Sequence, residues 1–172
     1  MPQPQHDYAA ILQVILRQYQ LPPKGDHGVE HWARVWTNGH VVGEKTGADL
    51  EVVSLFALFH DACRRNEYRD PGHGQRGGEL AHQLRGKHVH LDDQRFELLY
   101  EACRLHTDGL TIGDPTLLAC WDADRLDLGR VGITPDPDRL GSAPARELIS
   151  WAHHRAITGH APAEILQLWS TP

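Results

Sequence analysis

An apolar run at positions 52–59 constrains the fold of this chain more than any other feature of its sequence. The run reads Val-Val-Ser-Leu-Phe-Ala-Leu-Phe and follows Asp49, a residue type that often caps the N-terminus of a helix. Its apolar side chains point almost all round a helix, so a helix on the surface would not accommodate them. The sequence therefore predicts a helix from about Asp49 to Phe59 that is buried at the centre of the fold.

The remainder of the chain also follows the helical period. Helices are predicted from Tyr8 to Tyr19 (ended by Pro22-Pro23), Gly28 to Gly43, Gly78 to Leu84 (after the glycine-rich stretch 72–78), Asp92 to His106, Asp114 to Leu128, Ser142 through Trp151, and Ala161 to Trp169. No pair of strands, internal repeat or low-complexity segment is evident. The 172 residues, of which 40% are hydrophobic, can form one substantial core. We expect an all-α fold, with residues 1–172 forming a single compact domain of seven or eight helices.

Charge and cysteine content narrow the function classes. The chain has 17 basic and 23 acidic residues, a formal net charge of −6, which argues against binding duplex nucleic acid or an anionic membrane. No apolar run approaches the roughly 20 residues needed to span a bilayer, and the N-terminus does not resemble a signal peptide. Cys63, Cys103 and Cys120 form no Cys-x-x-Cys pair and lie in apolar helical patterns, which favours reduced thiols. A cytoplasmic location is the resulting prediction.

Polar residues stand at three places where the helical pattern calls for apolar ones. His60 and Asp61 directly follow the buried run, and His31 shares a helix face with Val35. An ionised aspartate at the end of a buried helix is costly unless it is paired or binds a metal. The chain also has 13 histidines, and histidine is the commonest metal ligand. These positions are therefore candidate metal ligands.

A helical wheel selects Asp124 as the third place. At about 100° per residue, Asp124 falls inside the apolar arc formed by Leu117, Cys120 and Leu128, whereas Asp122 lies on its flank and Asp127 at its other edge. Two imidazoles and two carboxylates facing one interior would suit Mn²⁺, Fe²⁺, Zn²⁺ or Mg²⁺ and leave positions open for water.

Together these residues resemble the H…HD…D signature of the HD-domain superfamily of metal-dependent phosphohydrolases. The resemblance runs from about His27 to Arg130 and includes the segment Asp-Ala-Asp-Arg-Leu-Asp at 122–127. It implies an all-α domain in which His31, His60, Asp61 and Asp124 hold a divalent metal ion (Mn, Fe, Zn, Ni or Mg). It also implies hydrolysis of a small phosphorylated substrate, often a nucleotide. Some members bind a second metal through two further histidines, and His73 and His106 fit that order. The sequence is compatible with a homo-oligomer as well as with a monomer.

Arginines near these ligands are candidates for binding phosphate. Arg64 and Arg65 follow Asp61 by three and four positions, so one of them is expected to face the cleft. Further candidates are Arg34, Arg76 and Arg125. Together with Asp61, the histidines His73, in a loop before a helix, and His106 are candidate catalytic groups. Several superfamily members have an acidic residue one turn after the HD pair. Arginines stand there in this chain, so the general acid could be Glu67, Asp122, His73 or His106.

Two other functions compete with the phosphohydrolase. The segment His27-Gly-Val-Glu-His31 fits H-x-x-E-H, an inverted zinc-peptidase motif in which Glu30 is the base. Gly28 weakens a helix inside that motif, and the motif leaves His60, Asp61 and Asp124 unexplained. A non-catalytic sensor for a nucleotide or metal would retain the same fold and ligands. Trp32, Trp36 and Trp121 have helical spacing and are interpreted as core residues.

Overall fold

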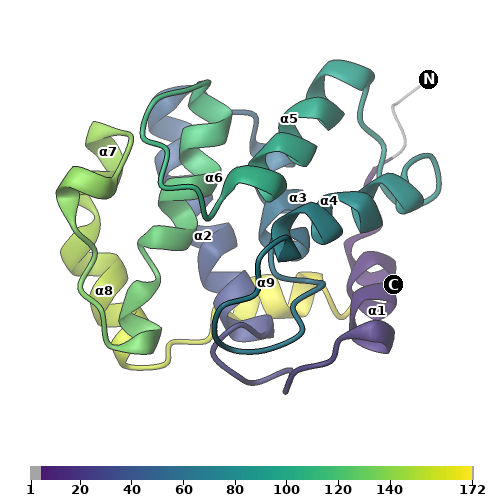
Figure 1. Cartoon of the computed structure of the whole chain (residues 1–172), viewed down its shortest axis with the longest axis horizontal. Coiled ribbons are helices and arrows are strands. Elements are labelled where there is room, and N and C mark those ends of the chain that lie inside the picture. Colours follow the sequence, from purple (N-terminus) through teal and green to yellow (C-terminus); the bar gives the residue numbers. More distant parts are fainter. Residues whose placement is uncertain (1–4, 172) are drawn as a thin grey trace.

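The computed structural model describes residues 5–171 and is helical throughout (Figure 1). In this range the α-helices are α1 (Tyr8–Gln18), α2 (Val29–Thr46), α3 (Leu50–Phe59), α4 (His73–Leu84), α5 (Asp93–Leu105), α6 (Pro115–Arg125), α7 (Ala143–Glu147), α8 (Ile149–Ile157) and α9 (Ala163–Leu168). Two short 3₁₀ helices, η1 (Leu128–Val131) and η2 (Pro137–Arg139), follow α6. Among these residues we find no β-strand, only an isolated bridge between Arg85 and Val89. The predicted all-α fold is confirmed, with nine α-helices in residues 5–171 rather than seven or eight.

Helix α3 is the central helix, as its sequence predicts. Every residue from Val52 through Phe59 is buried, and α3 contacts α2, α4, α5 and α6. The side chain of Asp49 caps α3 by accepting hydrogen bonds from the backbone N–H groups of Glu51 and Val52. Helices α7 and α8 lie at the left end of Figure 1, and α1 lies at the lower right. His60 and Asp61, which directly follow α3, are buried as well.

Helix α2 supplies the second main packing surface. It packs most extensively against α6 and α3, through buried residues that include Trp32 and Val35. Trp32, Trp36 and Trp121 are all buried in the core, as expected. The packing of α2 on α6 brings the first turn of α2 close to the last turn of α6.

Four helices differ clearly from the sequence prediction. Helix α2 continues past its predicted end, Gly43, to Thr46. Helix α4 begins at His73, so most of the glycine-rich stretch is helix rather than loop. Helix α6 ends at Arg125 rather than Leu128, because the chain tightens there: the N–H of Asp127 donates to the carbonyl of Asp124, three residues back. The long helix predicted from Ser142 divides at Leu148 into α7 and α8.

The three cysteines are free thiols, with Cys103 and Cys120 buried and Cys63 half-buried. Among residues 5–171, no helix combines the length and apolar character needed to cross a bilayer.

Candidate metal centre

Six histidine and aspartate side chains meet where five helices begin or end. Each residue comes from the end of a helix or the residues directly beside it: His31 from the first turn of α2, His60 and Asp61 after α3, His73 at the start of α4, His106 after α5, and Asp124 in the last turn of α6. All except Asp124 are buried, and Asp124 is half-buried. The structure thus brings together all four predicted metal ligands and both additional histidines.

The first half of this cluster contains His31, His60 and Asp124. The Nε2 atoms of His31 and His60 lie 3.1 Å apart. Oδ1 of Asp124 is 3.3 Å from Nε2 of His31 and 3.7 Å from Nε2 of His60. Three ligand atoms therefore surround one point.

The second half contains His73, His106 and Asp61. The Nε2 atoms of the two histidines lie 3.0 Å apart. Oδ1 of Asp61 is 3.1 Å from Nε2 of His73 and 3.7 Å from Nε2 of His106. The other oxygen of Asp61, Oδ2, is 3.5 Å from Nε2 of both His31 and His60. Asp61 therefore lies between the two halves and offers one oxygen to each.

The hydrogen bonds of the imidazole Nδ1 atoms fix which ring nitrogens face the centre. Nδ1 of His60 donates to the carbonyl of Phe56 (3.1 Å), and Nδ1 of His106 donates to that of Cys103 (2.7 Å). Nδ1 of His73 donates to the carbonyl of Asp70 (2.7 Å). A carbonyl can only accept, so Nδ1 carries the hydrogen and a neutral ring presents the Nε2 lone pair to the cluster.

His31 has the same orientation but a charged partner. Its Nδ1 donates to Oδ2 of Asp127 at 2.7 Å, and Oδ1 of the same carboxylate accepts a hydrogen bond from Nε of Arg34 at 2.7 Å. Asp127 is fully buried and Arg34 nearly so. A carboxylate behind a ligating histidine orients the ring and makes it a stronger donor.

This arrangement fits a metal ion. Imidazole Nε2 atoms that face each other at 3.0–3.1 Å repel when both carry lone pairs, unless a proton or a metal ion lies between them. Oδ1 of Asp124 is buried and makes no hydrogen bond to any residue in the described part of the chain. Histidine with carboxylate is a donor set typical of divalent transition metals. These residues therefore could hold a divalent metal ion at either half of the cluster.

The electrostatics of the cluster support the same conclusion. Burial lowers the pKa of His60 to about 3. Burial and Arg130 oppose protonation of His31, but contacts with Asp124, Asp127 and Asp61 outweigh them and raise its pKa to about 9. Although burial opposes ionisation of Asp61, the surrounding histidines hold its pKa well below the usual range. His31 and His60 therefore hold a cation between ionised carboxylates, which is either a proton on His31 or a bound metal ion.

Two clefts border the cluster, and its residues His106 and Asp124 line both of them. The first, of about 650 Å³, we call the arginine cleft; it is lined by Asp26, His27, Asp61, Arg64, Glu67, Tyr68, His106, Thr107, Asp124, Leu128, Arg130 and Val131. The second, of about 680 Å³, we call the loop cleft; it is lined by His106, Thr107, Gly109, Asp124, Arg125, Leu128, Ile133, Thr134, Pro135, Asp136, Arg139 and Leu140. A ligand bound at the cluster can extend into either.

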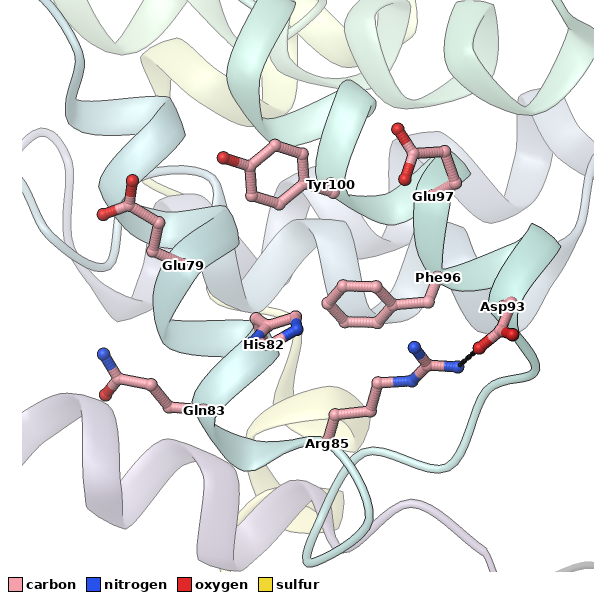
Figure 2. Close-up of a pocket in the computed structure, with 8 residues that line it drawn as sticks. All are labelled: Glu79, His82, Gln83, Arg85, Asp93, Phe96, Glu97 and Tyr100. Carbon is pink, nitrogen blue, oxygen red and sulfur yellow. Dashed lines mark hydrogen bonds and ion pairs between the residues drawn. The ribbon is translucent and has the colours of Figure 1, made fainter.

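A third cavity, of about 710 Å³, lies between α4 and α5 and contains none of the cluster residues (Figure 2). Arg85 lines this cavity, where its guanidinium lies over the ring of Phe96 and pairs with Asp93 at 2.5 Å. We take the histidine–aspartate cluster, where the ionisable groups are concentrated, as the candidate functional site rather than this third cavity.

The structure separates the two arginines that follow Asp61. Nε of Arg64 donates to Oδ1 of Asp61 at 3.1 Å, and Arg64 lines the arginine cleft. Arg65 is exposed and lines a different groove beside Arg76. Helix α3 ends at Phe59, so positions three and four residues after Asp61 do not share a helical face.

The other candidate arginines have partners within the protein. Arg34 pairs with Asp127 as described above, and Arg76 pairs with Asp70. Nη1 of Arg125 donates to the carbonyls of Leu110 and Arg139. Asp122, a candidate general acid, accepts hydrogen bonds from Gly141 and Ser142 and lines neither cleft.

The two histidines of the H-x-x-E-H segment do not lie one turn apart on a helix, as the peptidase motif requires. His27 precedes α2, which begins at Val29, and its Nδ1 pairs with Glu67. The ring of His31 instead faces that of His60. His27 and Glu67 remain neighbours of the cluster, because both line the arginine cleft.

Sequence reasoning did not single out two residues that lie beside the cluster, Arg130 and Asp127. Arg130 lies in η1, lines the arginine cleft and places Nη2 3.9 Å from Oδ1 of Asp124. The sequence signal that could have indicated Asp127 is its position three residues after Asp124, in the Asp-Ala-Asp-Arg-Leu-Asp segment. Arg130 follows Asp127 by the same three residues.

The helices and the cluster define an all-α domain whose helix ends converge on a buried histidine–aspartate centre. Comparison with solved structures finds the same architecture in the crystal structure of a predicted HD superfamily hydrolase from an uncultured Thermotogales bacterium. The two share 22% sequence identity with a TM-score of 0.65, over 94% of this chain and 91% of the other. This chain therefore shares the fold of that structure. No protein-family model and no curated protein matches the sequence.

Proposed function

We propose that this chain is a metal-dependent phosphohydrolase that cleaves a phosphate ester or phosphoanhydride of a small compound, with a nucleotide as the expected substrate class. One observation carries the proposal: two pairs of histidine Nε2 atoms face each other across Asp61, beside the unbonded Oδ1 of Asp124. The structural neighbour is described as a predicted hydrolase, which supports hydrolytic chemistry.

His31, His60, Asp61 and Asp124 would hold the metal ion required by this mechanism. His73 and His106, with the second oxygen of Asp61, would hold a second ion rather than act directly on the substrate. When bound, a divalent cation lowers the pKa of a coordinated water towards about 7 and draws negative charge from phosphoryl oxygens.

Three residues that line the arginine cleft, Arg64, His27 and Glu67, would act on the substrate. Arg64 contacts Asp61 and can place its guanidinium beside a phosphoryl oxygen bound at the cluster. His27 and Glu67 are in contact and line the same cleft, so this pair can deliver a proton to the leaving oxygen. Burial lowers the pKa of His27, so its imidazolium, once formed, gives up a proton more readily than a solvent-exposed histidine.

Metal content tests the proposed ligands. Elemental analysis should find roughly one or two transition-metal ions per wild-type chain and a loss of most of that metal in the His60→Ala, Asp61→Ala double variant. His154→Ala, which changes an exposed histidine on α8, is the matched control and should keep the metal. Equal metal content in the double variant and the control would refute the metal site.

The reaction class is tested with a panel of phosphorylated compounds, nucleotides included, in the presence of Mn²⁺. Phosphate release that disappears in the double variant would support the phosphohydrolase. Peptide cleavage without phosphate release, lost in Glu30→Gln, would favour the H-x-x-E-H peptidase. Tight nucleotide binding with no product would favour a sensor.

A further inference from the structure

Two arginines of the arginine cleft are held in place by backbone carbonyls. Nη1 of Arg64 donates to the carbonyls of Asn66 and Tyr68, each at 3.1 Å. Nε of Arg130 donates to the carbonyl of Asp26 at 2.7 Å, and its Nη1 donates to that of Asp127 at 3.0 Å. The side chains are only 11% and 8% exposed. A long side chain fixed in this way loses little further freedom when it binds a ligand.

Each guanidinium also retains donor capacity beside the cluster. Nε of Arg64 is 3.1 Å from Oδ1 of Asp61, and Nη2 of Arg130 is 3.9 Å from Oδ1 of Asp124. Within the described residues, neither Nη2 atom makes a hydrogen bond. Arg64 and Arg130 come from segments 66 positions apart in the chain yet line one cleft. Two ordered cationic donors therefore border the point where the ligand atoms converge.

The arginines of the loop cleft are less suited to holding an anion. The side chain of Arg139 is 82% exposed, and its contact with Asp136 is at the long distance of 4.0 Å. Arg125 is anchored by carbonyls, and its buried Nη2 makes no hydrogen bond to a described residue. It nevertheless lies beside the apolar side chains of Leu128 and Leu140 in that cleft. The loop cleft therefore suits the organic part of a ligand, and the arginine cleft suits its charged end.

We propose that Arg64 and Arg130 form a clamp for a terminal, dianionic phosphoryl group of the substrate, each donating through Nη2 to a non-bridging oxygen. This inference rests on the proposed phosphohydrolase function. Once bound metal balances Asp61 and Asp124, the two guanidinium charges match the charge of a phosphomonoester near neutral pH. An internal diester phosphate carries one charge fewer. The preferred substrate class is therefore a compound that ends in a phosphoryl group.

Binding of inorganic phosphate to the Mn²⁺-loaded protein tests the clamp without relying on turnover. Isothermal titration should show that Arg64→Met and Arg130→Met each weaken phosphate binding by roughly 10-fold or more, the expected effect of losing a charged hydrogen bond. Arg65→Met and Arg139→Met remove the same charge outside the clamp and should change the dissociation constant less than about two-fold. Elemental analysis should find equal metal in all four variants.

A second variant separates the clamp from a folding defect. Arg130→Met also removes two bonds to carbonyls, so its melting temperature is measured alongside. Arg130→Lys keeps the charge but has no fork that can reach both a carbonyl and a phosphate oxygen, and it should also bind phosphate more weakly. Full phosphate binding by Arg64→Met and by folded Arg130→Met or Arg130→Lys would overturn the clamp. Loss of binding in Arg139→Met alone would place the phosphate in the loop cleft and overturn it as well.

Hydrolysis of a monoester and a diester tests the substrate class. With p-nitrophenyl phosphate and bis(p-nitrophenyl) phosphate, Arg130→Met should lower kcat/KM for the monoester at least roughly 10-fold more than for the diester. Equal losses would refute the preference for a terminal phosphate. If no phosphorylated compound is cleaved but phosphate binding still depends on Arg64 and Arg130, the proposed hydrolase fails while the clamp stands. If Arg64→Met and Arg130→Met hydrolyse phosphorylated compounds as fast as wild type, the clamp fails while the proposed hydrolase stands.

Discussion

At the residue scale, neighbouring acids on α6 have different environments. Asp124 faces the histidines of the cluster, and its Oδ1 makes no hydrogen bond to a described residue. Asp122, two positions earlier, is fully buried but accepts hydrogen bonds from the backbone N–H groups of Gly141 and Ser142 and from the hydroxyl of Ser142. Asp122 therefore fixes the segment that leads into α7, whereas Asp124 is available to a metal.

Exchanging each acid for its amide should separate these roles. Asp124→Asn should lose most of the bound metal, because an amide is a weak ligand for a transition metal beside two imidazoles. Asp122→Asn should keep the metal but lower the free energy of unfolding by about 1–3 kcal/mol, since an amide cannot accept all three hydrogen bonds. Elemental analysis and urea unfolding measure the two effects. Greater metal loss in Asp122→Asn would mean that α6 is rotated relative to this structure.

The wheel that distinguishes these acids also shows where sequence reasoning reaches its limit. Asp124 could be placed because it lies within the regular helix, where a period of about 3.6 residues holds. Asp127 and Arg130 lie beyond Arg125, where α6 ends and the chain turns into η1, so the wheel no longer gives their directions. For the same reason the sequence could not show which of Arg64 and Arg65 faces the cleft, because both follow the end of α3.

At the element scale, helix α4 depends on glycines for its position. A Cβ at Gly77 would lie 2.0 Å from the carbonyl oxygen of Phe59, and one at Gly74 would lie 2.1 Å from that of Cys103. This close approach brings His73, at the start of α4, within reach of Asp61 and His106. In the sequence the same glycines favour a loop, because glycine has low helix propensity; close packing against two other helices outweighs that preference.

Gly77→Ala should therefore disturb both stability and the second half of the cluster. The added methyl group forces α4 away from α3, and we expect the free energy of unfolding to fall by about 1–3 kcal/mol despite alanine's higher helix propensity. Gly78→Ala is the matched control, since its nearest neighbour is the half-buried ring of Tyr100 rather than a backbone carbonyl. Urea unfolding compares the two. A Gly77→Ala protein as stable as wild type would contradict the packing described for α4.

The start of α1 should make stability sensitive to pH. Just before α1, Nδ1 of His6 accepts a hydrogen bond from the backbone N–H of His90 at 3.0 Å, which requires an unprotonated nitrogen. Burial lowers the pKa of His6, so between that value and about 6.5 the unfolded chain binds more protons than the folded one. The stability due to neutral His6 is fully present above pH 6.5 and is lost as the pH falls below it.

His6→Asn tests this because an amide oxygen can accept the same bond and does not titrate. Between pH 7.5 and pH 5, the wild-type protein should lose about 1 kcal/mol more stability than the Asn variant. Other buried histidines contribute equally to both proteins, so the difference isolates His6. Parallel pH profiles from urea unfolding would show that this hydrogen bond does not couple to protonation.

At the scale of the whole molecule, the fold and the meeting of His31, His60, Asp61 and Asp124 were predictable for one physical reason. A buried apolar helix that ends in a histidine and an aspartate leaves charged groups in the core, and only partners from other helices or a metal can compensate them. The meeting of five helix ends was not predictable, because it depends on tertiary packing rather than on local period. His73 and His106 could be placed in the correct order, but their approach to one oxygen of Asp61 follows only from the packing of α4 on α3 and α5.

Because the cluster joins segments from position 31 to position 124, metal binding should stabilise the entire fold. An ion that binds only the folded chain stabilises it by about 2.7 kcal/mol at a free concentration 100 times the dissociation constant. For a chain of this length that corresponds to a rise in melting temperature of roughly 5–10 °C. Thermal unfolding is measured after treatment with a chelator and again after adding Mn²⁺ or Zn²⁺. The rise should disappear in His60→Ala, Asp61→Ala and persist in His154→Ala. An equal rise in the double variant would mean that the ion binds elsewhere, and no rise in wild type would mean that the facing histidines do not hold a metal.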